Sequence, residues 1–584
     1  MHKKLLLLLI LISNLSFSQL SVRNSAYIFV NDEVVFVEDD INLNETNSTI
    51  YLRNEAQVIQ GAGTTGNSGV GELSVYQEAN GGEHEYNYWC SPIGSKTSNS
   101  LNNPFGISFL NDATGLITAT PATFVSTASF NGTSSPLNIE PYWVWKFIAS
   151  DNYAEWIHVE SNTSVNPGEG FTMKGTIGSG DAQRYDFRGK PNNGTIAVSV
   201  LTNQYSLVGN PYPSAMDAVA YIHDTQNAAT ITGTLYYWEQ DPTTNSHYIN
   251  EYNGGYATYT INAAGTVETF VSAVFNTYNG DGSINVANTG TGTKTARRYI
   301  PIGQGFMVEG AADDVVRAKN SHRIFTRETD ANSEFFKGTR TKKSKTENPF
   351  SEIPEDYKRF RLNIDFNNAY TRQLVQTFHD SATEGFDYGL ESKISESDII
   401  SSDAYWVIDG NSHIAEALAY NENSIIPLTI KLADSQPLTI RIADIQHFDD
   451  SNPIYLHDKQ TDVYVNLRNQ NFEINLDKGE YTDRFEVTFT KNVLSISENT
   501  FEGLRIFQNN NTSQIKLINK NNFEITSLKV YDVTGKEVLN KRIKSTKRRH
   551  ALSTKPLSSG VYVVKVELVN QELFTKKIVV SNKK

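Results

Sequence analysis

The stretch GVYVVKVELVNQELFTKKIVV, Gly560–Val580, decides the fold at the end of this chain of 584 residues. Its β-branched and aromatic residues favour strands, and two such runs joined through Val569–Gln571 predict a hairpin. Working back along the chain, SLKVYDVTGKEVLNKRI (Ser527–Ile543) predicts a second hairpin, with Gly535 supplying the positive φ of its turn. We therefore expect residues 504–584 to form a small antiparallel β-sandwich with an immunoglobulin-like architecture.

Charge separates this end from the rest of the protein. The chain carries a formal net charge of −14, yet residues 505–584 hold 17 Lys and Arg against 5 Asp and Glu, a net of +12. The remainder then has a net charge of −26. Such an asymmetry indicates a separate module with a separate role.

Three ordered motifs of this module resemble a known family. The motifs VYDVTGK (Val530–Lys536), GVYVVKV (Gly560–Val566) and KKIVV (Lys576–Val580) resemble the type A C-terminal sorting domain of the Bacteroidetes type IX secretion system (Por secretion system). The positions that carry the resemblance are Tyr531, Asp532, Gly535, Lys536, Gly560, Val561, Tyr562, Lys565, Lys576 and Lys577.

The resemblance implies a route and partners. The type IX secretion machinery would recognise the module in the periplasm, export the cargo across the outer membrane, and leave it secreted or on the cell surface. After cleavage of the module the cargo would be released or attached to surface lipopolysaccharide. Upstream motifs such as RLNIDF (Arg361–Phe366) and DRFEVTFT (Asp483–Thr490) resemble uncharacterised regions of large flavobacterial surface proteins, which supplies no activity.

The N-terminus predicts a signal peptide over residues 1–18. Lys3 and Lys4 precede the apolar run Leu5–Ile12, and small residues lead to a cleavage point between Ser18 and Gln19. The apolar run is too short to cross a bilayer, which takes about 20 residues. No second apolar run approaches this length, so we expect no transmembrane segment in the mature chain. The single cysteine, Cys90, excludes an intramolecular disulfide and is expected to be a buried apolar residue.

The region between these signals is predicted to be all-β and multidomain, a series of tandem sandwich-like units. Short strands fill residues 19–70, as a meander or as stacked β-turns. Residues 71–190 and 191–316 would be two copies of one β-unit. Residues 317–350 and 491–503 are expected to be linkers, and residues 351–490 a β-sandwich.

The internal repeat depends on three landmarks in the same order. YNYWCSP (Tyr86–Pro92) corresponds to YSLVGNP (Tyr205–Pro211), and GEGFTMKG (Gly168–Gly175) to GQGFMVEG (Gly303–Gly310). Between them, the aromatic runs PYWVWKF and TLYYWEQ would be matching strands. The alternative is that Gly-aromatic turns recur by chance in an aromatic-rich β-protein.

No motif for chemistry stands out. The 11 His form no zinc motif, and neither a nucleophile elbow nor a phosphate loop is present. We predict no catalytic residue, no metal site, no cofactor and no nucleic-acid partner. A carboxylate pair of a glycoside hydrolase remains open among Glu155, Glu169, Glu239 and Glu251.

Aromatic side chains are the candidates for binding. Trp143, Trp145 and Trp238 could stack on a sugar or contact a protein, although burial in the core is the simpler explanation. Trp143 and Trp145 would share a face if their segment is a strand. We expect a non-enzymatic, adhesin-like interaction protein with a glycan or protein ligand. The alternative is a secreted hydrolase or carbohydrate-binding protein acting on polysaccharide.

Overall fold

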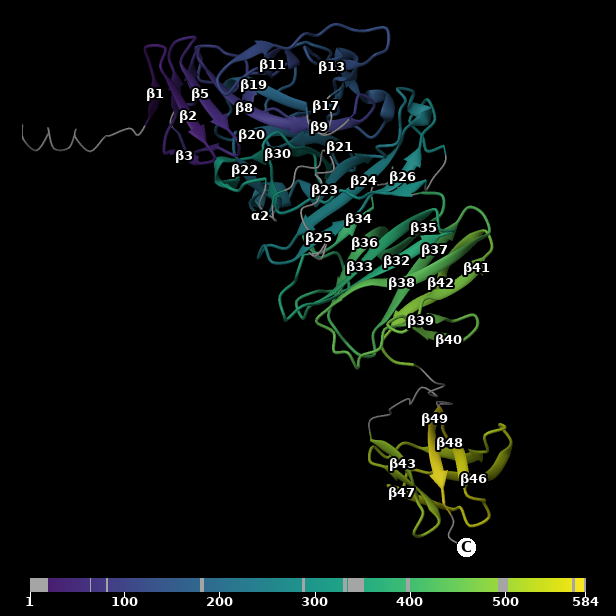
Figure 1. The fold of residues 1–584 in the computed structure, drawn as a ribbon. Coiled ribbons are helices and arrows are strands. Elements are labelled where there is room, and N and C mark those ends of the chain that lie inside the picture. Colours follow the sequence, from purple (N-terminus) through teal and green to yellow (C-terminus); the bar gives the residue numbers. More distant parts are fainter. Residues whose placement is uncertain are drawn as a thin grey trace, which may run out of the picture. The chain divides into compact units, whose positions relative to one another are not determined.

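The computed structural model divides the chain into two compact units, Met1–Thr490 and Lys491–Lys584. It describes residues 19–584 except 64, 80–81, 179–182, 286–288, 329–332, 334–350, 395–399, 492–502, 570–572 and 582–584. The predicted signal peptide, including Ser18, therefore lies outside the described residues, whereas Gln19 is described and exposed. The all-β, multidomain prediction is confirmed, since strands dominate both units (Figure 1).

The first unit begins with stacked parallel strands. Strands three apart in sequence pair in parallel, so that each turn of the chain lies on the previous one. The alternative of stacked turns is realised here, and the meander is not. The rows are β1 (Leu20–Val22), β4 (Ile41–Leu43) and β7 (Ser68–Gly69); β2 (Tyr27–Asn31), β5 (Thr49–Arg53) and β8 (Glu72–Ala79); and β3 (Val34–Val37) with β6 (Gln57–Gln60).

The stack leads into the first of two β-halves. Strand β8 continues the sheet into β19 (Gln183–Pro191), β11 (Leu110–Ala113), β12 (Ala119–Pro121) and β10 (Ile93–Gly94). Smaller pairings complete this half: β9 (Tyr86–Cys90) with β17 (Gly170–Lys174), β15 (Trp145–Lys146) with β16 (Ile157–His158), and β13 (Gly132–Ser134) with β14 (Leu137–Asn138) and β18 (Thr176–Ile177). Its 3-10 helices are η1 (Ile107–Phe109), η2 (Pro141–Trp143) and η3 (Tyr153–Glu155).

The second half is built around another sheet. Its order is β21 (Tyr205–Gly209), β29 (Gly305–Gly310), β23 (Ile231–Gln240), β24 (Asn253–Ile261), β26 (Val274–Thr277) and β27 (Gly290–Thr291), with β25 (Glu268–Val271) also on β24. Flanking elements are β20 (Ile196–Val200) with β30 (Asp314–Ala318), β28 (Tyr299–Ile300) with β22 (Ala215–Asp217) and β31 (Arg323–Ile324), and the short helices α2 (Ala218–Ile222), α3 (Thr225–Ala228), η4 (Ile249–Glu251) and η5 (Asn320–His322).

The first residues of the linker predicted over 317–350 belong to the fold of the first unit, and most of the rest lie outside the described residues. Residues 317–324 complete β30 and form η5 and β31. Arg323 holds this segment because it is 8% exposed, donates to the Val58 carbonyl and lies over the Tyr212 ring. A charged stretch predicts solvent exposure, but here the guanidinium of Arg323 is buried and hydrogen-bonded.

The strands of residues 358–488 form one continuous sheet and not two separate layers. The sheet curls around a single apolar core (Figure 1). Each strand therefore has one buried face, and the resulting sequence pattern is the one that predicts a β-sandwich. The order is β40 (Val463–Asn466), β39 (Tyr455–Asp458), β42 (Gly479–Thr488), β37 (Ile425–Leu432), β35 (Asp403–Ile408), β36 (Asn411–Leu418), β33 (Tyr370–Phe378), β32 (Lys358–Phe366), β38 (Gln436–Gln446) and β41 (Phe472–Leu476), with β34 (Ser392–Lys393) on β36.

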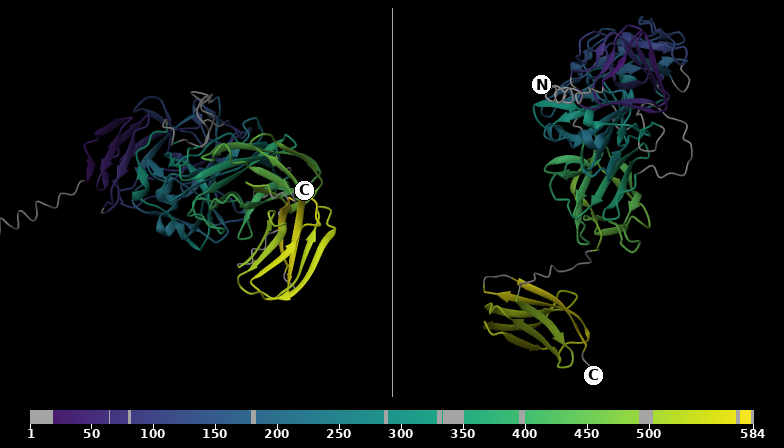
Figure 2. Two further views of the ribbon diagram at one scale, coloured as in Figure 1. Left: turned by 90° about the horizontal axis from the view of Figure 1, so that it is seen from below. Right: turned by 90° about the vertical axis from the view of Figure 1, so that its left-hand side faces the viewer.

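The second unit is the predicted sandwich. One sheet contains β43 (Leu504–Asn509), β44 (Gln514–Asn519) and β47 (Arg549–Ser553); the other contains β46 (Glu537–Ser545), β45 (Ile525–Tyr531), β48 (Gly560–Leu568) and β49 (Leu573–Val580). Both predicted hairpins, β45–β46 and β48–β49, are present. The two sheets enclose their own apolar core, as the two layers of strands in Figure 2 illustrate.

Candidate functional site

A cavity of about 990 Å³ lies in the first unit, between its two β-halves. This volume is at the upper end of the range of ligand pockets, roughly 300–1,000 Å³. We call it the aromatic cavity, because 15 of its 27 lining residues are Tyr, Trp or Phe, including four of the six Trp of the chain. These are Tyr86, Tyr88, Tyr142, Trp143, Trp145, Phe147, Tyr153, Trp156, Tyr205, Tyr236, Trp238, Tyr248, Tyr252, Tyr256 and Tyr278.

One wall comes from the segment that contains Trp143 and Trp145. The sequence predicts a strand here, but Pro141 stands at the first position of the 3-10 helix η2. The Glu140 carboxylate accepts a hydrogen bond from the backbone N–H of Tyr142. A proline whose φ is already fixed near −65° suits a helix start, which the strand prediction overlooked. The two tryptophans thus lie on different elements, η2 and β15, yet both line the cavity.

The opposite wall comes from long strands of the second half. Trp238 on β23 stands directly across from Tyr256 on β24, with ring centroids 5.2 Å apart in an edge-to-face arrangement. Gly254 permits this packing, since a Cβ there would lie 2.7 Å from the Trp238 ring. Cross-strand aromatic pairs of this kind stabilise a sheet face and hold the rings in place.

The two walls are joined directly, so the cavity is preformed. The hydroxyls of Tyr88 and Tyr256 are 2.7 Å apart, and Ser150 and Tyr205 exchange two backbone hydrogen bonds of 2.8 and 3.1 Å. At Gly282 the backbone lies so close to Tyr153 that a Cβ would overlap its ring. Contacts from both halves therefore fix the rings before any ligand arrives.

A buried lysine lies behind the first wall. Lys174 is 3% exposed; its ammonium nitrogen is 2.7 Å from the Tyr252 hydroxyl, 3.1 Å from Nδ1 of His247 and 3.9 Å from the centre of the Trp143 ring. Burial lowers the pKa of Lys174 to about 6, and burial together with nearby Lys174 and His84 lowers the pKa of His247 to about 4. Both groups are therefore mainly neutral at pH 7.

The polar groups of the lining are few and mostly paired. Glu309 is 1% exposed; one of its oxygens is 2.8 Å from the Lys393 ammonium, and the other accepts from the Tyr236 hydroxyl at 3.3 Å. Asp151 and Asp281 are exposed at the rim, Asp281 in a turn. Hydrogen bonds from Ser283 lower the pKa of Asp281, which keeps it charged.

The four glutamates considered for glycoside hydrolysis do not line the cavity. Glu169 pairs with Lys146 at 2.8 Å, and Glu239 accepts from the backbone N–H of Thr293 at 2.8 Å. Glu155 and Glu251 end the helices η3 and η4, whose preceding residues face the cavity instead. Among the described residues no three His, Cys, Asp or Glu side chains are grouped to hold a metal ion.

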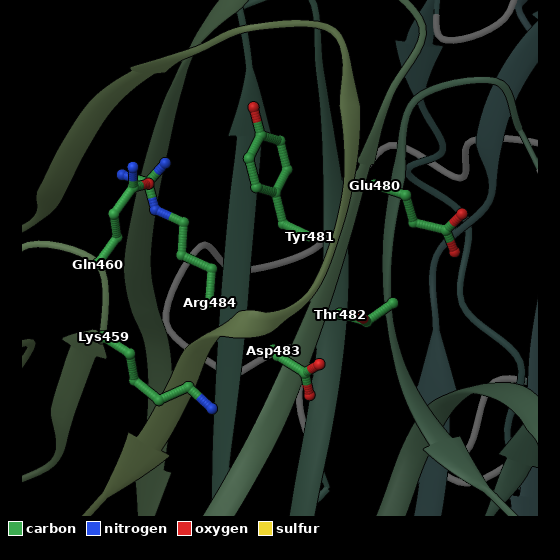
Figure 3. Close-up of a pocket in the computed structure, with 7 residues that line it drawn as sticks. All are labelled: Lys459, Gln460, Glu480, Tyr481, Thr482, Asp483 and Arg484. Carbon is green, nitrogen blue, oxygen red and sulfur yellow. The ribbon is translucent and has the colours of Figure 1, made fainter.

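A second depression of about 470 Å³ lies on the curled sheet, lined by Lys459, Gln460, Glu480, Tyr481, Thr482, Asp483 and Arg484. Its side chains spread in different directions and do not converge on one point (Figure 3). Arg484 is already paired with Asp458 at 2.8 Å, and Glu480 accepts from the Tyr405 hydroxyl at 3.0 Å. The aromatic cavity is the stronger candidate, because its side chains face a common space.

The residues of the predicted sorting motif lie in a turn and on strands of the second unit. Asp532 accepts hydrogen bonds from the backbone N–H of Thr534 and Lys536, and Gly535 has a φ of +82° in the same turn. Tyr562 is 7% exposed and its hydroxyl donates to the Ser558 carbonyl. The remaining motif positions, Tyr531, Gly560, Val561, Lys565, Lys576 and Lys577, lie on β45, β48 and β49.

The cysteine and the helices of the described residues bear on two further predictions. Cys90 is fully buried, which raises the pKa of its thiol, in keeping with the predicted apolar role. Of the helices within the described residues, none has both the length and the apolar character needed to span a bilayer.

Comparisons with known proteins assign both units. A family model described as a domain of unknown function, DUF8693, matches residues 119–489, and a model of a secretion system C-terminal sorting domain matches residues 505–581. No curated protein matches. Two solved structures are distantly similar: the 47-kilodalton lipoprotein Tp47 of Treponema pallidum (8% identity, 66% of this chain and 91% of that chain, TM-score 0.11), and the BSP domain of a biofilm associated protein (9% identity, 76% and 88%, TM-score 0.12). At such TM-scores neither likeness bears on function.

Proposed function

The chain belongs to the DUF8693 family and ends in a secretion system C-terminal sorting domain, and from this premise we propose that it is an exported binding protein that holds a glycan in its aromatic cavity. The sorting domain makes it cargo of the type IX secretion machinery, delivered to the cell surface or secreted. We also propose that the chain comes from a bacterium of the Bacteroidetes, that it has an adhesin-like role at the cell surface, and that it is attached there to lipopolysaccharide.

The observation that carries the proposal is the concentration of aromatic side chains in one cavity. Sugar rings present apolar C–H faces and polar edges, which match the flat faces and polar tips of Trp and Tyr. Trp145 illustrates the arrangement: its indole N–H donates to the Tyr142 carbonyl at 2.7 Å and its ring stacks on His158 at 4.1 Å. A ring held at its edge and against one face loses little entropy when a ligand binds.

A binding role fits the polar groups better than hydrolysis does. Glycoside hydrolysis uses a general acid and a second carboxylate on opposite sides of the scissile bond. The buried carboxylate of the lining, Glu309, is committed to Lys393 and Tyr236, and Asp151 and Asp281 are exposed. The cavity therefore offers contact area without a poised acid.

The test is a glycan array probed with the mature chain and three variants. Trp145→Ala and Trp238→Ala each remove a ring of the cavity and should weaken binding about tenfold or more, the loss typical of an anchoring aromatic residue. Tyr27→Ala removes an aromatic side chain, 58% exposed, from the strand stack outside the cavity and should bind like the parent. Binding that survives both tryptophan substitutions in folded protein would contradict the proposal.

A further inference from the structure

The lining of the aromatic cavity carries negative charge but no positive charge of its own. Its 27 residues include Asp151, Asp281 and Glu309, and none of them is Lys or Arg. His247 is the one basic side chain in this set, and its lowered pKa of about 4 leaves it neutral at pH 7. An anionic ligand would therefore find no cationic partner on the lining.

The side chains at the buried end of the cavity have little net charge. Glu309 is compensated by Lys393, whose ammonium lies 2.8 Å from it. The side chain of Lys174 lies behind the first wall against the rings of Tyr86, Trp143 and Tyr252, and its pKa of about 6 leaves it mainly neutral at pH 7. The uncompensated charge of the site is thus at the rim, on Asp151 and Asp281.

The two rim aspartates come from opposite halves. Asp151 precedes the helix η3 of the first half, and Asp281 lies in the turn Asn279–Ser283 of the second. These segments meet where Gly282 packs against Tyr153. A ligand that enters beside this contact passes carboxylates from both halves.

We propose that the aromatic cavity selects uncharged glycans and rejects sulfated or uronic-acid-rich ones, with Asp151 and Asp281 as the residues that determine this specificity. The inference rests on the proposed function and names the ligand class of that site. An uncharged sugar is not repelled by the carboxylates at the rim and can still stack on the aromatic rings of the cavity. A sulfate or carboxylate group would be repelled at the rim and would lose its water at depth without a cation to pair with.

The experiment compares matched ligands with the full mature chain. Uncharged hexasaccharides of glucose, mannose and xylose are measured beside the same oligosaccharides carrying sulfate groups, by calorimetry at 20 mM and 500 mM NaCl. For the hexasaccharide that binds, we expect the affinity for the uncharged form to be at least tenfold higher than for its sulfated form at low salt. The preference should shrink at high salt, since screening weakens repulsion between exposed charges.

A double variant tests the residues. Asp151→Asn with Asp281→Asn keeps the side-chain size and should strengthen binding of the sulfated member several-fold, so that the preference for the uncharged member shrinks. Asp313→Asn is the matched control: Asp313 is an exposed carboxylate outside the cavity that accepts from Thr202, and its loss should leave both affinities unchanged.

The outcomes separate the two proposals. Equal or tighter binding of the sulfated member by the parent chain overturns the selectivity but leaves glycan binding standing. An unchanged preference in the double variant removes Asp151 and Asp281 as its cause. Binding of neither member of any pair overturns glycan binding itself, and the selectivity with it.

Discussion

Lys174 is buried without a carboxylate beside it, and this has a cost that can be measured. Its hydrogen-bond partners are the Tyr252 hydroxyl and Nδ1 of His247, and aromatic rings surround it, but none of these groups carries a negative charge. The folded pKa of about 6 is far below the value of about 10.4 in an unfolded chain. Between these two pH values the unfolded state binds a proton that the folded state lacks, so the free energy of unfolding rises with pH.

Lys174→Met should therefore make the protein more stable at pH 7, by about 2–4 kcal/mol after the lost hydrogen bonds are counted. The stability difference between variant and parent should be largest and constant below about pH 6. It should shrink as the pH rises toward 10, where the lysine is neutral in both states. Urea unfolding at several pH values measures this directly.

Lys146→Met is the matched control. Lys146 is also largely buried, but its ammonium lies 2.8 Å from Glu169, which would be left without its cation. This variant should be less stable than the parent at pH 7. If Lys174→Met were equally destabilising, the neutral state that we assign to Lys174 would be wrong.

At the scale of elements, the paired turns at Gly168 and Gly303 relate the two halves. Strand β9 pairs with β17 as β21 pairs with β29, and Phe171 and Phe306 are both fully buried after their glycines. The cross-bridges are reciprocal, since Trp89 bridges Gln304 and Val208 bridges Glu169. These pairings support the proposed duplication of one β-unit.

The two turns should differ in their tolerance of alanine. Gly168 and Gly303 have φ values of +84° and +80°, so a Cβ is strained in both, at roughly 1–2 kcal/mol. At Gly168 the new Cβ would also lie 2.7 Å from a methyl carbon of Ile196, whereas at Gly303 the nearest atom is 3.6 Å away. Gly168→Ala should therefore lower the unfolding midpoint more than Gly303→Ala. If the two variants lowered the unfolding midpoint equally, the backbone strain alone would account for the loss of stability, and the contact with Ile196 would contribute nothing.

Some elements could be predicted from the sequence and others could not, for physical reasons. The hairpins of the second unit were predictable because alternation and a Gly turn are local signals, as at Gly535. The parallel register of residues 19–70 was not, because partners such as Val30 and Leu52 lie a full turn of the chain apart. The same limit applies to the site. Trp143, Trp145 and Trp238 were candidates, but their convergence depends on contacts between halves, such as that of Tyr88 with Tyr256.

At the scale of the whole molecule, the two units have separate cores and should unfold separately. The core of the second unit draws on both of its sheets, with Leu517 and Val564 among its members, and includes no residue of the first unit. Calorimetry of the full chain should show a transition of about 60 kcal/mol for the second unit, from about 0.7 kcal/mol per residue. Removal of residues 504–584 should abolish this transition and leave the unfolding of the first unit unchanged. A single shared transition would show that the units are coupled.

The same separation predicts how export depends on the second unit. Because residues 504–584 fold around their own core and match the sorting domain, their deletion should leave the first unit in the periplasm, still folded and able to bind its ligand. Fractionation followed by immunoblotting locates the protein. The converse experiment fuses residues 491–584 to a periplasmic reporter, which should then reach the cell surface or the medium. If the truncated chain were displayed normally, or if the reporter stayed behind, the sorting information would have to lie in the first unit as well.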